Sequence, residues 1–144
     1  MADKLTGSCL CGGVAFEIER AASPIGQCHC SKCRKVSGTD GNAVFYADVA
    51  DYKMTKGEEL IKSYVVPGST GWTANFCSVC GSPMPHSDHD GSKYFVPAGL
   101  LDSDFGQAGY AAHIFVESKA DWVSIADAAP QFPEGFDSEP VLQK

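Results

Sequence analysis

The chain has 144 residues, of which 44% are hydrophobic, and a formal net charge of -7 at pH 7. This length and apolar share predict one domain, residues 1–144, with a core of its own. The acidic balance disfavours a nucleic-acid partner. No run approaches the roughly 18 apolar residues of a membrane span, and the N-terminal residues lack the apolar region of a signal peptide. We therefore expect a cytoplasmic protein with no membrane partner.

The first half of the chain predicts two strands separated by loops. Residues 14–19 alternate apolar and polar side chains, which is typical of a half-buried strand, and residues 20–26 read as a loop. Residues 35–41 contain the serine, glycine and aspartate typical of another loop, and residues 42–47 are β-prone. Residues 48–56 fit either a short helical turn or an irregular link.

The second half predicts four more strands. Residues 60–66 form a β-prone run that ends at a Pro-Gly turn, and residues 72–76 alternate toward the next cysteine. Residues 93–98 and 113–118 are further strand candidates. Several short strands without a long segment of helical period predict a mainly β fold.

The domain is expected to divide into a core and a tail. The core covers about residues 5–125, where the predicted strands lie. Residues 126–144 contain three prolines and no strand pattern, so we expect an irregular C-terminal tail.

Seven cysteines fall in three tight groups along the chain: Cys9 and Cys11; Cys28, Cys30 and Cys33; and Cys77 and Cys80. The odd count, the short spacings and the absence of a secretion signal favour metal binding over disulfides. Two of the groups lie beside glycines, which suit the tight backbone of a metal-binding knuckle. All-thiolate sets with this spacing favour zinc, with an iron–sulfur cluster as the alternative.

Spacing alone leaves two ways to divide the seven ligands. In the first, one zinc is held by four cysteines of the outer groups, and the middle group holds a second zinc with one coordination position open. In the second, Cys30 and Cys33 join Cys77 and Cys80 in a zinc ribbon, and the other cysteines are left over. The local triple of the middle group favours the first division without deciding it.

Motifs across most of the chain resemble one known family. They comprise Gly7-Ser8-Cys9-Leu10-Cys11-Gly12-Gly13-Val14, Cys28-His29-Cys30-Ser31-Lys32-Cys33-Arg34, Phe76-Cys77-Ser78-Val79-Cys80-Gly81-Ser82, and His113-Ile114-Phe115-Val116 with Trp122. Their order and internal spacings are similar to those of the glutathione-dependent formaldehyde-activating enzymes, a family that also includes centromere protein V.

This resemblance implies a β-tent fold, in which small antiparallel sheets are pinned by zinc knuckles with few or no helices, and two zinc ions per chain. It assigns the structural zinc to Cys9, Cys11, Cys77 and Cys80, and the catalytic zinc to Cys28, Cys30 and Cys33. The implied activity is that of a carbon–sulfur lyase, which condenses glutathione with formaldehyde to S-(hydroxymethyl)glutathione. The implied partner is therefore a small-molecule thiol such as glutathione.

Other polar side chains lie near the cysteines or within the family-like motifs. Lys32 and Arg34, with Lys35, could receive a substrate carboxylate or could form a solvated loop. His29 lies between two cysteines, and in extended backbone its ring would point away from the metal. We expect His113 to be a hydrogen-bonded structural histidine.

Two functional hypotheses follow from the sequence. The first is a zinc-dependent carbon–sulfur lyase that acts on a thiol–aldehyde adduct, because zinc with an open position can deprotonate a bound thiol at neutral pH. The second is a non-catalytic zinc scaffold that binds a protein partner. A site one ligand short of closure is difficult to explain in a scaffold, so we favour the enzyme.

Overall fold

The computed structural model describes residues 3–68 and 72–141 and divides the chain into two compact units. The first unit comprises Met1–Ser23 and Phe45–Gly106, and the second comprises Pro24–Val44 and Gln107–Lys144. Each unit is therefore discontinuous in sequence and brings together segments that are far apart along the chain.

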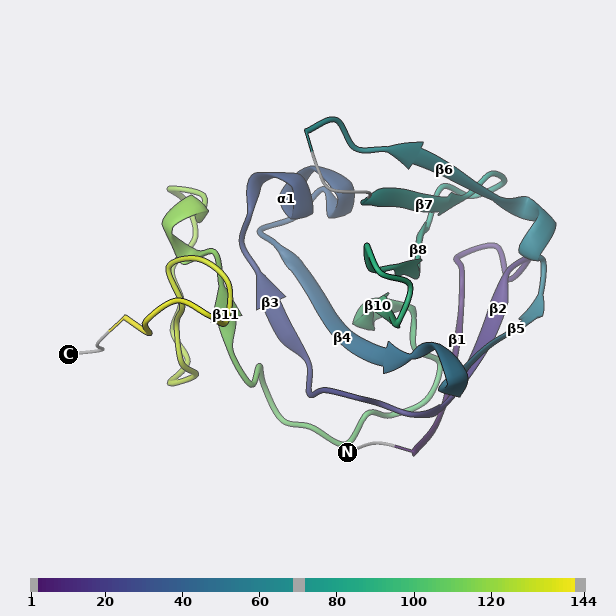
Figure 1. The fold of residues 1–144 in the computed structure, drawn as a ribbon, viewed down its shortest axis with the longest axis horizontal. Helices are drawn as coiled ribbons and strands as arrows, with labels where there is room; N and C mark the ends of the chain where they lie inside the picture. The colour runs from purple at the N-terminus through teal and green to yellow at the C-terminus, as the bar shows by residue number, and fades with distance from the viewer. Residues whose placement is uncertain (1–2, 69–71, 142–144) are drawn as a thin grey trace. The chain divides into compact units, whose positions relative to one another are not determined.

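The regular secondary structure of the described residues is mainly β (Figure 1). The strands are β1 (Asp3–Ser8), β2 (Ala15–Arg20), β3 (Gly26–Cys28), β4 (Asn42–Asp48), β5 (Tyr52–Lys56), β6 (Ile61–Val65), β7 (Thr73–Cys77), β8 (Pro83–Met84), β9 (His86–Ser87), β10 (Lys93–Pro97) and β11 (His113–Ile114). The α-helix found in the described residues is α1 (Ser31–Ser37), and short 3₁₀ turns cover Val49–Asp51, Glu58–Leu60, Ala98–Leu100 and Val116–Ser118. The predicted mainly β fold with few helices is confirmed.

One antiparallel sheet of the first unit has the strand order β1-β2-β5. Leu5 lies opposite Ile18 and Gly7 opposite Phe16. Phe16 and Ile18 alternate with an exposed glutamate and are each 1% exposed, as the period-two pattern predicts. The ring of Phe16 fills the space where a side chain at Gly7 would begin, so glycine is required there.

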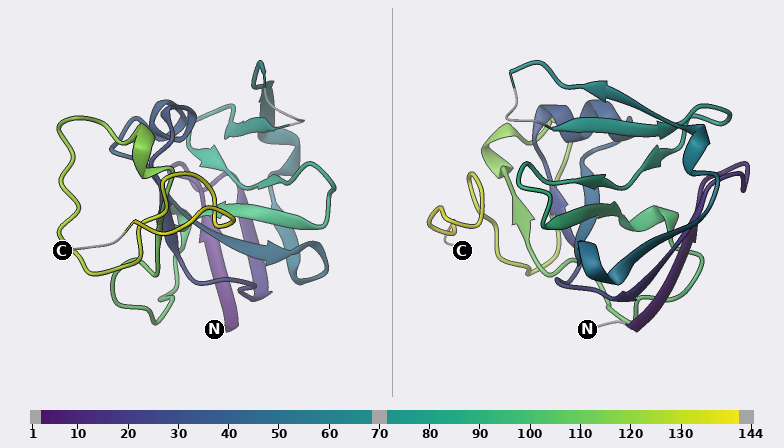
Figure 2. Two further views of the ribbon diagram at one scale, coloured as in Figure 1. Left: turned by 60° about the vertical axis from the view of Figure 1, so that its left-hand side comes forward. Right: turned by 45° about the vertical axis from the view of Figure 1, so that its right-hand side comes forward.

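The second sheet of the first unit has the order β6-β7-β8. The antiparallel pair of β6 and β7 is visible at the top of the right-hand view of Figure 2, and its register runs from Ile61 opposite Cys77 to Val65 opposite Thr73. Strand β7 therefore ends on a fully buried cysteine. The predicted strands at 60–66 and 72–76 agree with β6 and β7 to within one residue at each end.

The third sheet has the order β11-β3-β4-β10-β9. Its strands β11 and β3, with the first three residues of β4, belong to the second unit, and the remaining strands belong to the first. Strand β11 is parallel to β3 and places Ile114 beside Cys28, whereas β4 is antiparallel to β3 and places Asn42 beside Cys28. The last residue of β3 is thus held by strands on both sides.

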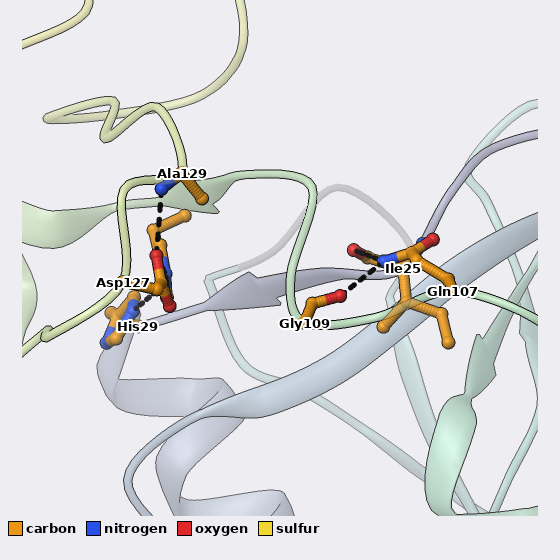
Figure 3. A network of polar contacts seen from close by, with 7 residues as sticks. Ile25, His29, Gln107, Gly109, Asp127 and Ala129 are labelled. Atoms are coloured by element: carbon orange, nitrogen blue, oxygen red, sulfur yellow. Dashed lines mark hydrogen bonds and ion pairs between the residues drawn. The ribbon is translucent and has the colours of Figure 1, made fainter.

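Gln107 links two distant segments of the second unit (Figure 3). Its side-chain amide donates to the carbonyl oxygens of Ile25 at 3.0 Å and Gly109 at 2.7 Å, and its oxygen accepts from the Ile25 amide at 2.9 Å. These contacts attach the segment before β11 to the segment before β3.

Four local features differ from the sequence-based expectations. Helix α1 replaces the first part of the loop predicted at 35–41, and the strand predicted at 113–118 ends at Ile114. It ends because Phe115 has φ 55°, a left-handed conformation that interrupts a strand, and a 3₁₀ turn follows. Trp122, whose large side chain would ordinarily be mostly buried, is 69% exposed. Residues 48–56, left undecided, form a 3₁₀ turn and strand β5.

No helix in the described part of the chain combines the length and apolar character that a bilayer span requires.

His86 is partly buried rather than exposed as its polar turn suggests. Its ring stacks on Phe95 at a centroid distance of 5.1 Å and lies 5.6 Å from the ring of Trp72. Burial lowers the pKa of His86 to about 4, from an ordinary value of 6.5. The imidazole is therefore neutral in the folded protein at pH 7.

The buried ring of His86 predicts a loss of stability in mild acid. Below pH 6.5 the unfolded chain takes up a proton that the folded chain accepts only near pH 4, so stability falls through this window. Between pH 7 and pH 5, this residue should lower the free energy of unfolding by about 2 kcal/mol. Urea unfolding at the two pH values should show a smaller pH effect in His86→Gln than in the wild type. His89→Gln, in an exposed position of the same turn, is the control, and equal pH effects in all three proteins would contradict the prediction.

Candidate metal centres

The first cysteine cluster joins two distant segments of the first unit. Cys9 and Cys11 lie in the turn between β1 and β2, Cys77 ends β7, and Cys80 lies in the turn before β8. Their four sulfur atoms all lie within 4.8 Å of one another. Four ligands of the preferred zinc type therefore converge on one point.

Backbone amides of the first cluster point at its sulfurs. The Val14 amide donates to Cys9 Sγ at 3.3 Å, and the Gly13 amide donates to Cys11 Sγ at 3.4 Å. Gly12, inside this turn, has a backbone φ of 75°, which residues other than glycine rarely adopt. The turn is shaped so that its N–H groups stabilise negative charge on sulfur.

Ser82 is a functional candidate that the spacing of the cysteines did not identify. Its hydroxyl oxygen accepts from the Leu10 amide at 2.9 Å and lies 3.4 Å from Cys80 Sγ, so it connects the two knuckles. Hydrogen bonds from the hydroxyl and backbone amide of Ser82 lower the pKa of Cys80 to about 5. A serine two positions after a cysteine in a knuckle was the signal available in the sequence.

The distances in the first cluster fit a zinc ion. Cys9 Sγ lies 3.6 Å from Cys11 Sγ, which lies 3.9 Å from Cys77 Sγ. A regular tetrahedron with zinc–sulfur bonds of about 2.3 Å separates its sulfurs by roughly 3.8 Å. The described residues therefore have the donor type, the number and the spacing of a closed tetrahedral site.

The second cluster lies where β3 passes into α1, in the second unit. Cys28 ends the strand and is 6% exposed, Cys30 is the N-cap of the helix, and Cys33 lies in its first turn. The three sulfurs lie within 4.8 Å of one another, and the Cys33 amide donates to Cys30 Sγ at 3.3 Å. Hydrogen bonds from the Cys28 and Cys33 thiols and from helix amides lower the pKa of Cys30 to about 2. Cys30 is therefore the most readily ionised of the three.

Within the described residues, the second group contains three cysteines and no histidine or carboxylate. The ring of His29, which lies between two of the ligands, is fully buried and directed elsewhere: its Nε2 lies 2.9 Å from His113 Nδ1. His113 is 2% exposed and also contacts Asp127, so it is hydrogen-bonded as expected. The three donors fit a zinc ion that retains one position for a ligand from outside the protein.

The basic residues of α1 do not behave alike. Lys32 and Lys35 are exposed, and Arg34 is half-buried. Arg34 Nη2 donates to the Ser118 carbonyl at 3.2 Å, and its Nε is buried without a hydrogen-bond partner among the described residues. Arg34 therefore holds the segment after β11, whereas Lys32 is free to meet a ligand.

Comparisons with known proteins agree with this geometry. The family model described as "Glutathione-dependent formaldehyde-activating enzyme" matches residues 4–118. The chain belongs to this family. A Halomonas elongata protein named "Putative glutathione-dependent formaldehyde-activating enzyme" is 34% identical over 126 residues, which cover 84% of this chain and 80% of that protein. A crystal structure of a Rhodobacter sphaeroides protein matches with a TM-score of 0.58 and 25% identity, over 69% of this chain and 89% of that one.

The match to the formaldehyde-activating family covers all seven cysteines and His113, and it ends before Asp127. The structure groups the sulfurs as in the first of the two divisions, with four in one cluster and three in the other.

Replacing Ser82 by alanine should weaken metal binding at the first cluster while leaving its four sulfurs in place. The variant loses the hydroxyl that connects Leu10 to Cys80, and outer contacts of this kind typically change metal affinity about 10- to 100-fold. Chelator competition on the zinc-loaded protein measures the effect. Ser78→Ala, an exposed position in the same knuckle, is the control. Equal zinc affinity in the two variants would show that Ser82 does not support the site.

The two clusters should differ in what their loss does to the fold. Cys77→Ala should lose one zinc and unfold the first unit, because binding at a structural zinc site contributes on the order of 10 kcal/mol or more. Cys30→Ala should lose one zinc and remain folded, because its cluster links residues that are already neighbours in the chain. Zinc content and circular dichroism of both variants test this. If Cys30→Ala unfolds as completely as Cys77→Ala, the proposed division between the clusters is wrong.

Proposed function

We propose that this protein is a zinc-dependent carbon–sulfur lyase that acts on a thiol–aldehyde adduct, similar to S-(hydroxymethyl)glutathione. The observation that carries the proposal is the second cluster, in which three sulfurs converge without a fourth ligand from the described residues. The family supports the same reaction class. We further propose two zinc ions per chain, one structural at the first cluster and one catalytic at the second.

The residues of the second cluster have defined roles in this proposal. Cys28, Cys30 and Cys33 hold the metal as thiolates. A zinc ion held by them would supply positive charge that favours loss of the proton from a substrate thiol at neutral pH. His29 leaves the remaining position open because its ring is bonded to His113 instead. Cys28 is buried, and Cys30 and Cys33 are half-buried, so the cluster is only partly shielded from solvent.

The proposed reaction balances without a redox partner. In the forward direction the thiol sulfur forms a bond to the carbonyl carbon of formaldehyde, and the proton lost by the thiol ends on the carbonyl oxygen. In the reverse direction the carbon–sulfur bond breaks and the proton returns to sulfur. The chain's part is to hold the sulfur in place, which replaces a bimolecular encounter by a prepositioned one.

Lys32 is the proposed contact for a substrate carboxylate. It is exposed on the first turn of α1, one residue before a ligand cysteine. Arg34 is the second candidate, although its Nη2 already donates to the Ser118 carbonyl. Glutathione carries two carboxylates, so a cation beside the sulfur site would favour it over an uncharged thiol.

A reducing compartment suits this function, and we propose the cytoplasm. All seven cysteines are free in the structure, and both clusters need them as thiolates.

Formaldehyde exchange with glutathione tests the proposal directly. Exchange NMR of a glutathione–formaldehyde mixture should show faster interconversion when the zinc-loaded protein is added. Cys30→Ala should restore the uncatalysed rate. Lys32→Ala should raise KM roughly 3- to 10-fold with little change in kcat, as expected for the loss of one exposed charge contact.

S-Methylglutathione distinguishes thiol capture from docking of the carboxylates. It carries the same charges as glutathione but cannot form a thiolate. Its inhibition constant should therefore be much higher than the dissociation constant of glutathione itself. If the zinc-loaded protein leaves the uncatalysed rate unchanged, the scaffold hypothesis replaces the enzyme.

A further inference from the structure

A chain of three side chains runs from the C-terminal segment to the loop of the second cluster. The Asp127 carboxylate contacts His113 Nε2 at 3.0 and 3.1 Å, and His113 Nδ1 lies 2.9 Å from His29 Nε2. His29 and Asp127 are labelled in Figure 3, where the carboxylate also accepts from the Ala129 amide at 2.9 Å. Both histidines are almost fully buried.

If both rings are neutral, the donors and acceptors allow one proton arrangement along this chain. The carboxylate accepts, so His113 carries its proton on Nε2 and its Nδ1 is an acceptor. His29 must then donate from Nε2, which leaves its Nδ1 without a proton. His29 Nδ1 is buried and has no hydrogen-bond partner in the described structure. The hydrogen bond that holds the ring is therefore the one made by its other nitrogen, Nε2.

The backbone of His29 is held as firmly as its ring. Its amide donates to the Ile114 carbonyl at 2.9 Å, next to the residue pair that joins β3 to β11. On one side lies Cys28 at the end of β3, and on the other lies Cys30 at the N-cap of α1. His29 alone connects the strand to the helix cap, so fixing it fixes the spacing of two ligand sulfurs.

Asp127 lies in the C-terminal segment, residues 126–144, that the sequence predicted to be irregular. The His113 amide donates to the Pro130 carbonyl at 2.8 Å, and the His113 carbonyl accepts from the Phe132 amide at 2.8 Å. The segment therefore lies along β11 as an ordered part of the second unit. Hydrogen bonds from the Ala129 amide and His113 lower the pKa of Asp127. The lower pKa favours the ionised carboxylate, which can accept both hydrogen bonds.

We propose that Asp127, His113 and His29 form a positioning relay through which the C-terminal segment sets the geometry and metal affinity of the Cys28–Cys30 loop. The inference rests on the proposed zinc site at the second cluster. None of the three residues is assigned contact with substrate. Because Asp127 lies beyond the residues that match the family model, the relay would make the affinity of this centre depend on a part of the chain outside that match.

Two variants and a control test the relay in the full-length, zinc-loaded protein. Asp127→Ala removes the acceptor, Asp127→Asn keeps the shape of the side chain but removes its charge, and Asp121→Ala removes an exposed carboxylate of the same unit. In chelator competition, the zinc affinity of the second cluster should fall by about tenfold or more in Asp127→Ala and by less in Asp127→Asn. The first cluster should be unchanged in all three and so reports that the protein remains folded.

Histidine NMR supplies a readout that a general loss of stability would not produce. In ¹⁵N-histidine-labelled wild type, His29 and His113 should both carry their protons on Nε2. Asp127→Ala should redistribute the His113 proton between its two nitrogens, and Asp121→Ala should not. Spectra of His86→Gln and His89→Gln assign the remaining two histidines.

The outcomes separate this inference from the proposed function. Zinc release that is equal in wild type and Asp127→Ala, or a His29 proton on Nδ1 in the wild type, would overturn the relay even if the protein accelerates formaldehyde exchange. Easier zinc release in Asp127→Ala from a protein that does not accelerate exchange would support the relay and reject the lyase.

Discussion

The first unit brings four cysteine sulfurs together from segments 66 positions apart in the chain. As thiolates, sulfurs this close would repel one another, and a cation bound between them would remove that repulsion. A metal bound there would link the turn after β1 to the end of β7. A small β unit without long helices gains most from such a long-range link.

The second cluster is built on a different principle. Its ligands lie within six residues, so a metal there closes almost no loop and adds little to the fold. Its geometry comes instead from a strand end and a helix cap, which are fixed by backbone hydrogen bonds. The proposed function therefore assigns long-range stabilisation to the first cluster and local chemistry to the second. A reactive centre benefits from this separation, because exchange of its outer ligand does not disturb the link that holds the fold.

The sequence predicted the features that depend on local pattern. The alternation at 14–19 gave the inward faces of Phe16 and Ile18, and the turn at Pro67-Gly68 gave the end of β6. It missed β3 and α1 because three- and seven-residue elements carry too little periodicity, and their stability comes from Cys28 pairing on both sides and Cys30 capping the helix. It could not choose between the two divisions of the cysteines, because that choice depends on which strands pair, and pairing is non-local.

His29 shows why ligand spacing alone is an incomplete guide to a metal site. Its position between Cys28 and Cys30 places a further metal-binding group close to the ligands in sequence, but adjacent side chains in extended backbone point to opposite sides. The structure adds an active reason for its absence from the cluster: the ring is committed to His113, and through it to a carboxylate that lies in the C-terminal segment. A histidine in this position that lacked the buried partner would be free to turn toward the metal. The buried pair therefore supports the proposed open position in two ways, because it occupies the nearest competing donor and holds the loop between the two sulfurs in place.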